Sequence, residues 1–160
     1  MLKHSIILSS LLMTPAANTV WWNTGGGSVV QENSGEREKC TLTIESGQAR
    51  FAFVWRRGLP PTIMAAQADW RLPADATTPV ALRIGDVWLG NGNGAPNIAA
   101  ATGPSAVMII PDQPFDKLLS SADEVVIRTQ ATQFGIQVTR AKMTALVTAA
   151  HKCRASIGSD

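Results

Sequence analysis

Apolar and polar residues alternate with a period of two in the part of the chain that follows Cys40. Leu42 and Ile44 alternate with threonines, and the run from Phe51 to Trp55 is apolar on both faces. A period of two is typical of β-strands, and a glycine at position 47 between the runs favours a tight turn. The pattern predicts an antiparallel hairpin over residues 41–56.

Further apolar runs predict strands along the rest of the chain. A weaker strand is expected over 64–70, and another over 80–84 that can continue, after Gly85-Asp86, over 87–89. The continuous apolar run 107–110 is typical of a central strand, and 125–129 with 134–138 form a second hairpin. Loops are expected at the basic segment 56–61, over 72–79, and at the glycine- and asparagine-rich segment 90–97.

Two segments have the spacing of helices. Phe115, Leu118, Leu119 and Ala122 predict a short helix near 114–122, with Pro114 in its first turn. A stripe of Met143, Leu146, Val147 and Ala150 predicts a C-terminal helix near 140–152, capped by Thr139. The predicted fold class is therefore mainly β, a sandwich or curved antiparallel sheet, with these two helices packed on it.

The start of the chain has the features of a secretory signal. Lys3 precedes the uncharged run from Ser5 to Met13, and Thr14-Pro15-Ala16 supplies small residues for cleavage. We expect a signal peptide over 1–16, a flexible arm over 17–39 with one short strand near Val29, a single β-rich domain over 40–153, and a tail over 154–160. No second apolar stretch reaches membrane length, so no membrane insertion of the mature chain is expected.

The two cysteines fit an exported protein. Cys153 falls close to the apolar stripe of the C-terminal helix, where a strand bearing Cys40 can meet it. Export to the periplasm or beyond the cell places both cysteines in an oxidising compartment, where a disulfide is the default state. We therefore expect a Cys40–Cys153 bridge that closes most of the mature chain into one loop.

The polar residues do not assemble into a recognisable catalytic or metal-binding motif. His151 is the one histidine after position 16, and with two distant cysteines it cannot build a zinc site of the usual kind. Gly90 to Gly94 resembles a phosphate loop but lacks the helix that such a loop opens. The formal net charge of +2 gives no argument for nucleic-acid binding. We expect no cofactor, no metal and no enzyme activity.

Three short segments are candidate binding surfaces. Arg56 and Arg57 can contact an acidic partner, although an arginine pair is also common at a solvated strand end. A second candidate is the expected loop at Gly90, Asn91, Gly92 and Asn93. The third is the adjacent pair Trp21 and Trp22, which can anchor a partner or fasten the arm to the sheet.

The order of elements in the C-terminal half resembles a known family. A strand ends near Ile110-Pro111, a short helix covers 115–122, and a hairpin leads to a helix that contains Ala145-Leu146 and ends in a cysteine. Over roughly residues 79–153 the chain resembles the invasion-associated locus B family of small secreted bacterial proteins. The resemblance implies a β-rich, non-enzymatic envelope protein linked to host interaction, and it supplies no catalytic residues. The chain departs from the family in lacking extra cysteine pairs.

These observations favour an exported, non-enzymatic binding protein of the bacterial envelope, involved in host or envelope interaction, with another protein as its partner. The alternative is a periplasmic inhibitor or immunity protein that blocks a hydrolase or toxin by inserting a surface loop. A rigid scaffold suits that role because its loop needs little ordering on binding. The segments Gly90–Asn97 and Arg56–Pro61 are the candidate loops for such an inhibitor.

Overall fold

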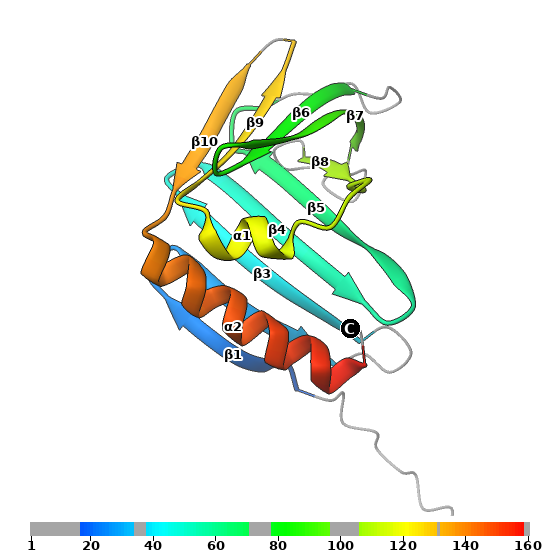
Figure 1. Ribbon diagram of the computed structural model, residues 1–160, viewed down its shortest axis with the longest axis vertical. Coiled ribbons are helices and arrows are strands. Elements are labelled where there is room, and N and C mark those ends of the chain that lie inside the picture. The colour runs from blue at the N-terminus through cyan, green and yellow to red at the C-terminus, as the bar shows by residue number, and fades with distance from the viewer. Residues whose placement is uncertain (1–16, 34–37, 71–77, 97–105, 131, 159–160) are drawn as a thin grey trace, which may run out of the picture.

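The computed structural model describes residues 17–33, 38–70, 78–96, 106–130 and 132–158. In these residues the fold is mainly β, as predicted, with two helices packed against antiparallel strands (Figure 1). The strands are β1 (Thr19–Thr24), β2 (Gly27–Glu32), β3 (Lys39–Ser46), β4 (Ala49–Arg56), β5 (Leu59–Gln67), β6 (Thr78–Ile84), β7 (Val87–Pro96), β8 (Ala106–Ile109), β9 (Glu124–Thr129) and β10 (Gln133–Gln137). The helices are α1 (Asp116–Ser121) and α2 (Arg140–Ile157).

The strands are hydrogen-bonded in the order β1-β2-β3-β4-β5-β8-β7-β6-β9-β10. The first five follow chain order as a meander, and the remaining five form an upper part that folds over it (Figure 1). The last strand, β10, packs against β3 and β4 from the other end of this order. The sheet therefore closes on itself around one core, which gives the sandwich-like arrangement.

The segment 17–39, expected to be a loose arm, instead supplies two strands of the sheet. The prediction of a short strand near Val29 is confirmed, but β2 pairs with both β1 and β3 along its length. Val29 is fully buried, and Trp21 packs against the core. The arm prediction was wrong because it was based on the average polarity of the segment. One buried valine and one packed tryptophan are enough to attach this hairpin to the core, since backbone hydrogen bonds already hold its strands together.

Other predicted strands and connections also differ from the structure. Only Arg57 and Gly58 separate β4 from β5, so Leu59–Pro61 belongs to a strand, and that strand ends at Gln67, before residue 70. The strand over 80–84 was expected to continue over 87–89, but the chain reverses at Gly85-Asp86 and these residues form two antiparallel strands. The segment Gly90–Pro96, predicted as a loop, is part of β7.

The strand over 90–96 forms because its backbone has partners on both sides. Residues 91–94 pair with β6, and Ala95 and Pro96 pair with β8. Backbone hydrogen bonds do not depend on side chains, so a glycine-rich segment can complete a ladder between two existing strands. Asn97, the last residue of the predicted loop, lies outside the described residues, as do the signal segment 1–16 and most of the predicted connection 72–79.

Both helices occur where the spacing predicts them, with different ends. α1 begins at Asp116 after an N-cap at Phe115, so Pro114 precedes the helix and does not lie in its first turn. The hydroxyl of Thr139 accepts a hydrogen bond from the Lys142 backbone N–H, which confirms the predicted cap of α2. α2 runs to Ile157 and ends at Gly158, so residues 154–157 of the expected tail are helical.

The predicted disulfide is present. Cys40 on β3 and Cys153 on α2 are fully buried and bonded, with their Cα atoms 6.0 Å apart. Met143, Leu146 and Ile157 on the same helix are also fully buried, so the expected apolar stripe faces the sheet. The bridge therefore fastens the last third of α2 to the start of β3, the middle strand of the five-strand meander.

Candidate functional site

Residues of the β4–β5 turn and of the C-terminal end of α2 line a pocket of about 730 Å³, which we call the arginine pocket. Figure 1 shows where these two parts of the backbone lie. Three segments that are remote in sequence line the pocket: Trp55, Arg56, Arg57, Gly58, Leu59 and Pro61 around the hairpin turn; Pro111, Asp112, Gln113, Pro114 and Asp116 before and at the start of α1; and Arg154 and Gly158 on α2. Its volume is within the range of ligand-binding pockets.

An ion pair and a cation–π contact hold the inner side of the pocket. The guanidinium of Arg154 donates to a carboxylate oxygen of Asp116 at 2.7 Å, which links α2 to α1. Its central carbon also lies 5.3 Å from the ring centroid of Trp55. Both charged side chains are largely buried, so solvent screens their interaction less than it would at the surface. Arg154 is therefore fixed in position by two neighbours.

Arg57 connects the hairpin turn to the end of α2. Its Nε donates to the Ile157 carbonyl oxygen at 2.7 Å, so it satisfies one of the helix's terminal acceptors. Its Nη2 lies 3.5 Å from a carboxylate oxygen of Glu38, and the side chain is 66% exposed. Arg56 donates to the hydroxyl of Thr62 at 3.4 Å. Of the candidate pair, Arg57 therefore connects the hairpin turn to α2, whereas Arg56 contacts a residue of β5.

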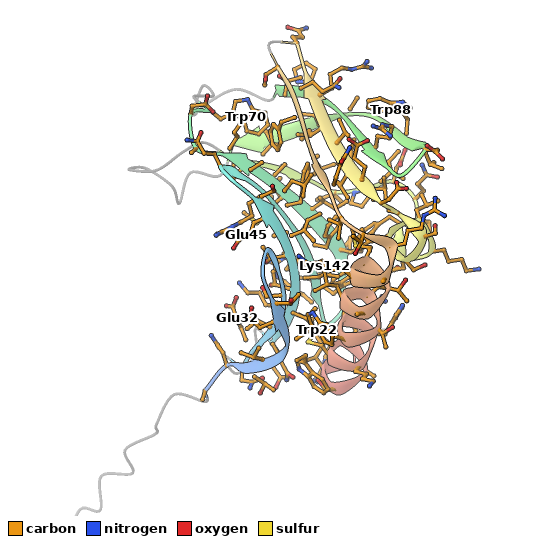
Figure 2. All side chains as sticks on the ribbon, turned by 90° about the vertical axis from the view of Figure 1, so that its left-hand side faces the viewer. Trp22, Glu32, Glu45, Trp70, Trp88 and Lys142 are labelled. Carbon is orange, nitrogen blue, oxygen red and sulfur yellow. A yellow bond between two sulfur atoms is a disulfide. The ribbon has the colours of Figure 1, made fainter. Side chains whose placement is uncertain are left out.

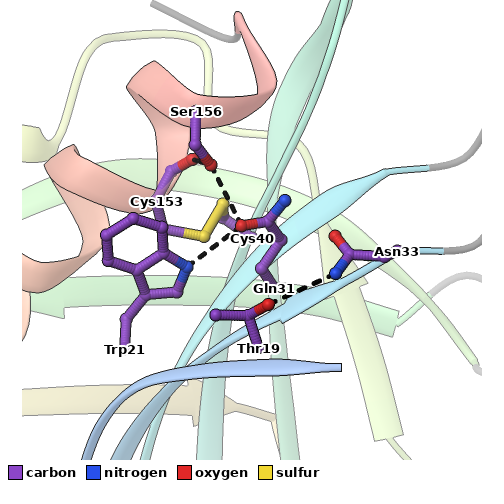
Figure 3. Close-up of a disulfide and its surroundings, with 7 residues drawn as sticks. All are labelled: Thr19, Trp21, Gln31, Asn33, Cys40, Cys153 and Ser156. Carbon is purple, nitrogen blue, oxygen red and sulfur yellow. Dashed lines mark hydrogen bonds between the residues drawn. A yellow bond between two sulfur atoms is a disulfide. The ribbon is translucent and has the colours of Figure 1, made fainter. Parts of the chain in front are cut away.

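The disulfide supports the pocket from behind. Cys40 is directly opposite Trp55 in the β3–β4 register, and Cys153 immediately precedes Arg154. Figure 3 shows the surroundings: Trp21 Nε1 and the hydroxyl of Ser156 both donate to the side-chain oxygen of Gln31, each at 3.0 Å. Two walls of the pocket are therefore anchored to one covalent link.

The two neighbouring tryptophans of β1 have separate roles. Trp21 is half-buried and hydrogen-bonded, so it fastens β1 to β2 and lies beside the disulfide (Figure 3). Trp22 is 40% exposed and lies where β1 approaches α2 (Figure 2). Because neither residue lines the arginine pocket, the structure does not bring the tryptophan candidates together with Arg56 and Arg57.

The remaining sequence candidates lie elsewhere. Gly90, Asn91, Gly92 and Asn93 are in strand β7, whereas the pocket is formed by β4, β5, the α1 region and α2. His151 is exposed on α2 and does not line the pocket. In the part of the chain that the structure describes, no group of three or more His, Cys, Asp or Glu side chains has the arrangement of a metal site, and no helix is long and apolar enough to cross a membrane.

Sequence reasoning missed most of the pocket. Pro111, Pro114, Asp116 and Arg154 are separated from the arginine pair by at least fifty positions, and none belongs to a recognisable motif. Their side chains line one pocket because α2 packs across β1, β2 and β3, and α1 packs against α2. The one available signal was the predicted disulfide, which implies that the residues next to Cys153 lie near β3 and β4.

Comparisons with known proteins add no relative: no protein-family model, no curated protein and no solved structure matches this chain.

Proposed function

We propose that the chain is an exported, non-enzymatic binding protein of the bacterial envelope, and that the arginine pocket is its contact surface for a protein partner. The observation that carries the proposal is the position of Arg56 and Arg57, which the sequence singles out and which open onto a pocket completed by two remote segments. Guanidinium groups beside an aromatic ring and prolines are common in recognition surfaces, because arginine combines charge with weak hydration.

The fixed positions of the side chains on the inner wall of the pocket support this proposal. Its inner wall is fixed by the Arg154–Asp116 pair and by the disulfide, so a partner would meet a surface that is already ordered. Preorganisation lowers the entropic cost of binding. The proposed export rests on the apolar segment 1–16, which lies outside the described residues, and the buried disulfide is compatible with it.

The inhibitor alternative has less support from the fold. One of its two candidate loops, Gly90–Asn97, is a strand over its described part, and the other is reduced to the tight turn at Arg57-Gly58. A two-residue turn reaches less far into an enzyme cleft than a long loop does. We therefore place recognition in a pocket of this protein, and not in a loop that it inserts into another.

A differential capture experiment tests the proposal. Disulfide-bonded protein is immobilised and exposed to an envelope extract of its source organism, and captured proteins are identified by mass spectrometry. The matched variants are Arg56→Glu/Arg57→Glu and Arg50→Glu, since Arg50 lies at the opposite end of the same strand, in an exposed ion pair. We expect a partner that wild type and Arg50→Glu retain and the double variant loses. A partner held equally by all three proteins would contradict this placement of the surface.

A further inference from the structure

The charges that line the arginine pocket limit the ligand that it can accept. Among the described residues that line it, three are arginines and two are aspartates, so the lining carries a single net positive charge. The Asp116 carboxylate is already bonded to Arg154 at 2.7 Å. The Asp112 side chain is exposed at the rim. A ligand with several negative charges would meet two like charges, Asp112 and the Glu38 carboxylate 3.5 Å from Arg57. A monoanion can instead pair with the outer N–H groups of the Arg57 guanidinium, whose side chain is 66% exposed.

The walls next to the guanidiniums are apolar. Leu59 is directly opposite Arg56 in the β4–β5 register, and it is 59% exposed. Pro61, Pro111 and Pro114 add apolar surface from two segments. Large apolar side chains with this exposure gain free energy when a ligand covers them. The ligand's charge must therefore be attached close to an apolar body.

Taken together, we propose that the arginine pocket binds a monocarboxylate carried on an apolar body. Arginine is suited to this group because its planar fork can donate two parallel hydrogen bonds to the two oxygens of a carboxylate. This proposal rests on the proposed function and specifies its chemistry: in a protein partner, the group would be the free α-carboxylate that follows apolar C-terminal residues. A long-chain fatty acid has the same chemistry and is the other source.

Binding of defined probes tests the chemistry directly. The probe is a fluorescein-labelled peptide, Gly-Ser-Ala-Val-Leu, with either a free carboxylate or a C-terminal amide, titrated with the disulfide-bonded protein by fluorescence anisotropy. We expect the free acid to bind about 10- to 100-fold more tightly than the amide, since a hydrogen bond to a charged group is lost. Unlabelled dodecanoate, hexaglutamate and inorganic phosphate serve as competitors.

The competitors distinguish a protein C-terminus from a fatty acid as the source of the carboxylate. Tighter binding of the peptide acid than of dodecanoate identifies a protein C-terminus and supports both the proposed function and this chemistry. The reverse order identifies a fatty acid, which supports the chemistry of the pocket but contradicts a protein partner as its occupant. Equal binding of acid and amide peptides, no binding of either peptide or of dodecanoate, or stronger competition by hexaglutamate or phosphate would overturn it. If charge reversal at Arg56 and Arg57 still abolishes capture of a partner in such a case, the proposed function survives and only this inference fails.

Three substitutions at exposed positions, one of them a control, locate the binding site without threatening the fold. Leu59→Ser should weaken binding of the peptide acid about 3- to 10-fold through lost apolar contact, whereas Val20→Ser, at a side chain of matching exposure on β1, should not change it. Asp112→Asn should increase competition by hexaglutamate, because it removes the like charge. Equal effects of the Leu59 and Val20 substitutions would place the apolar contact elsewhere and contradict the proposal.

Discussion

The two ends of strand β4 are built alike locally and differ in what surrounds them. Each end leads into a tight turn with a glycine at positive φ, Gly47 at 57° and Gly58 at 68°. Each also has an arginine near a glutamate: Arg50 at 2.8 Å and Arg57 at 3.5 Å. From the residues of the hairpins alone, neither end is distinguished as a functional site.

The two ends of β4 differ in the segments, remote in sequence, that contact them. Arg50 contacts a residue five positions away, in an ion pair that is about half exposed. Arg57 instead contacts the carbonyl of Ile157, one hundred positions away, and the segment before α1 completes the pocket around it. An arginine at a strand end becomes part of a site only when other elements surround it. The pocket end of β4 should therefore differ energetically from the Arg50 end.

The largest effect is expected for the disulfide behind the pocket. Cys153→Ser should lower the free energy of unfolding by about 2–4 kcal/mol, because the bridge closes a long loop in the unfolded chain. Urea denaturation of the oxidised wild type and the variant measures this difference. Titration of free thiols in the denatured, unreduced wild type is the control, and two free thiols would show that the bridge does not form in solution.

A smaller effect is expected for the ion pair on the inner wall. Arg154→Met keeps apolar contact with Trp55 but leaves the Asp116 carboxylate without this cation, so we expect a loss of about 1–2 kcal/mol, reduced by partial exposure of the pair. Urea denaturation of the wild type, Arg154→Met, Asp116→Asn and the double variant forms a double-mutant cycle, which isolates the free energy of interaction between the two side chains. Additive effects of the two single changes would show that the pair is not coupled.

The two arginines at the ends of β4 give the direct comparison. Arg57→Ala removes a hydrogen bond to the last turn of α2 and should cost about 1 kcal/mol, whereas Arg50→Ala removes an exposed ion pair and should cost about 0.2–0.5 kcal/mol. Amide hydrogen exchange in residues 153–158 should rise only in Arg57→Ala. Equal stability losses, with unchanged exchange at the end of α2, would remove the proposed difference between the ends.

The smallest effect is expected for His151. This side chain is exposed and outside the pocket, so His151→Ala should change stability and peptide binding by less than about 0.5 kcal/mol. Anisotropy titration and urea denaturation measure both. Loss of all activity in the variant would contradict the binding-protein proposal and favour an enzyme.

Much of the fold was predictable because its periodic signals are strong. The alternation of Leu42 and Ile44 and the helical stripe at Met143 and Leu146 each identify a face that is now fully buried. The strand over 90–96 and the β1–β2 hairpin were not predictable from the same signals, since their backbone hydrogen bonds depend on neighbouring strands. Pairing partners are tertiary information, which a local pattern does not contain.

The candidate site was predictable only at its hairpin. Arg56 and Arg57 stand out as adjacent charges after an apolar run, but nothing near them indicates Arg154 or Pro111 as neighbours. The expected disulfide carried the useful long-range information, because it places the residue after Cys153 near the strand opposite Cys40. The full lining of the pocket and the Arg154–Asp116 pair required the structure.

The most direct test of the arginine pocket is the mapping of a bound ligand on the protein by NMR. The isotope-labelled, disulfide-bonded protein is titrated with the Gly-Ser-Ala-Val-Leu free acid, and shifts are followed for backbone amides, arginine Nε–H groups and the buried indole N–H of Trp55. We predict that the changes concentrate in residues 55–61, 111–116 and 154–158, with Arg50 and its turn unaffected. Shifts centred on Arg50, on the exposed Trp22 or on Trp88 at the other end of the molecule (Figure 2) would contradict the account.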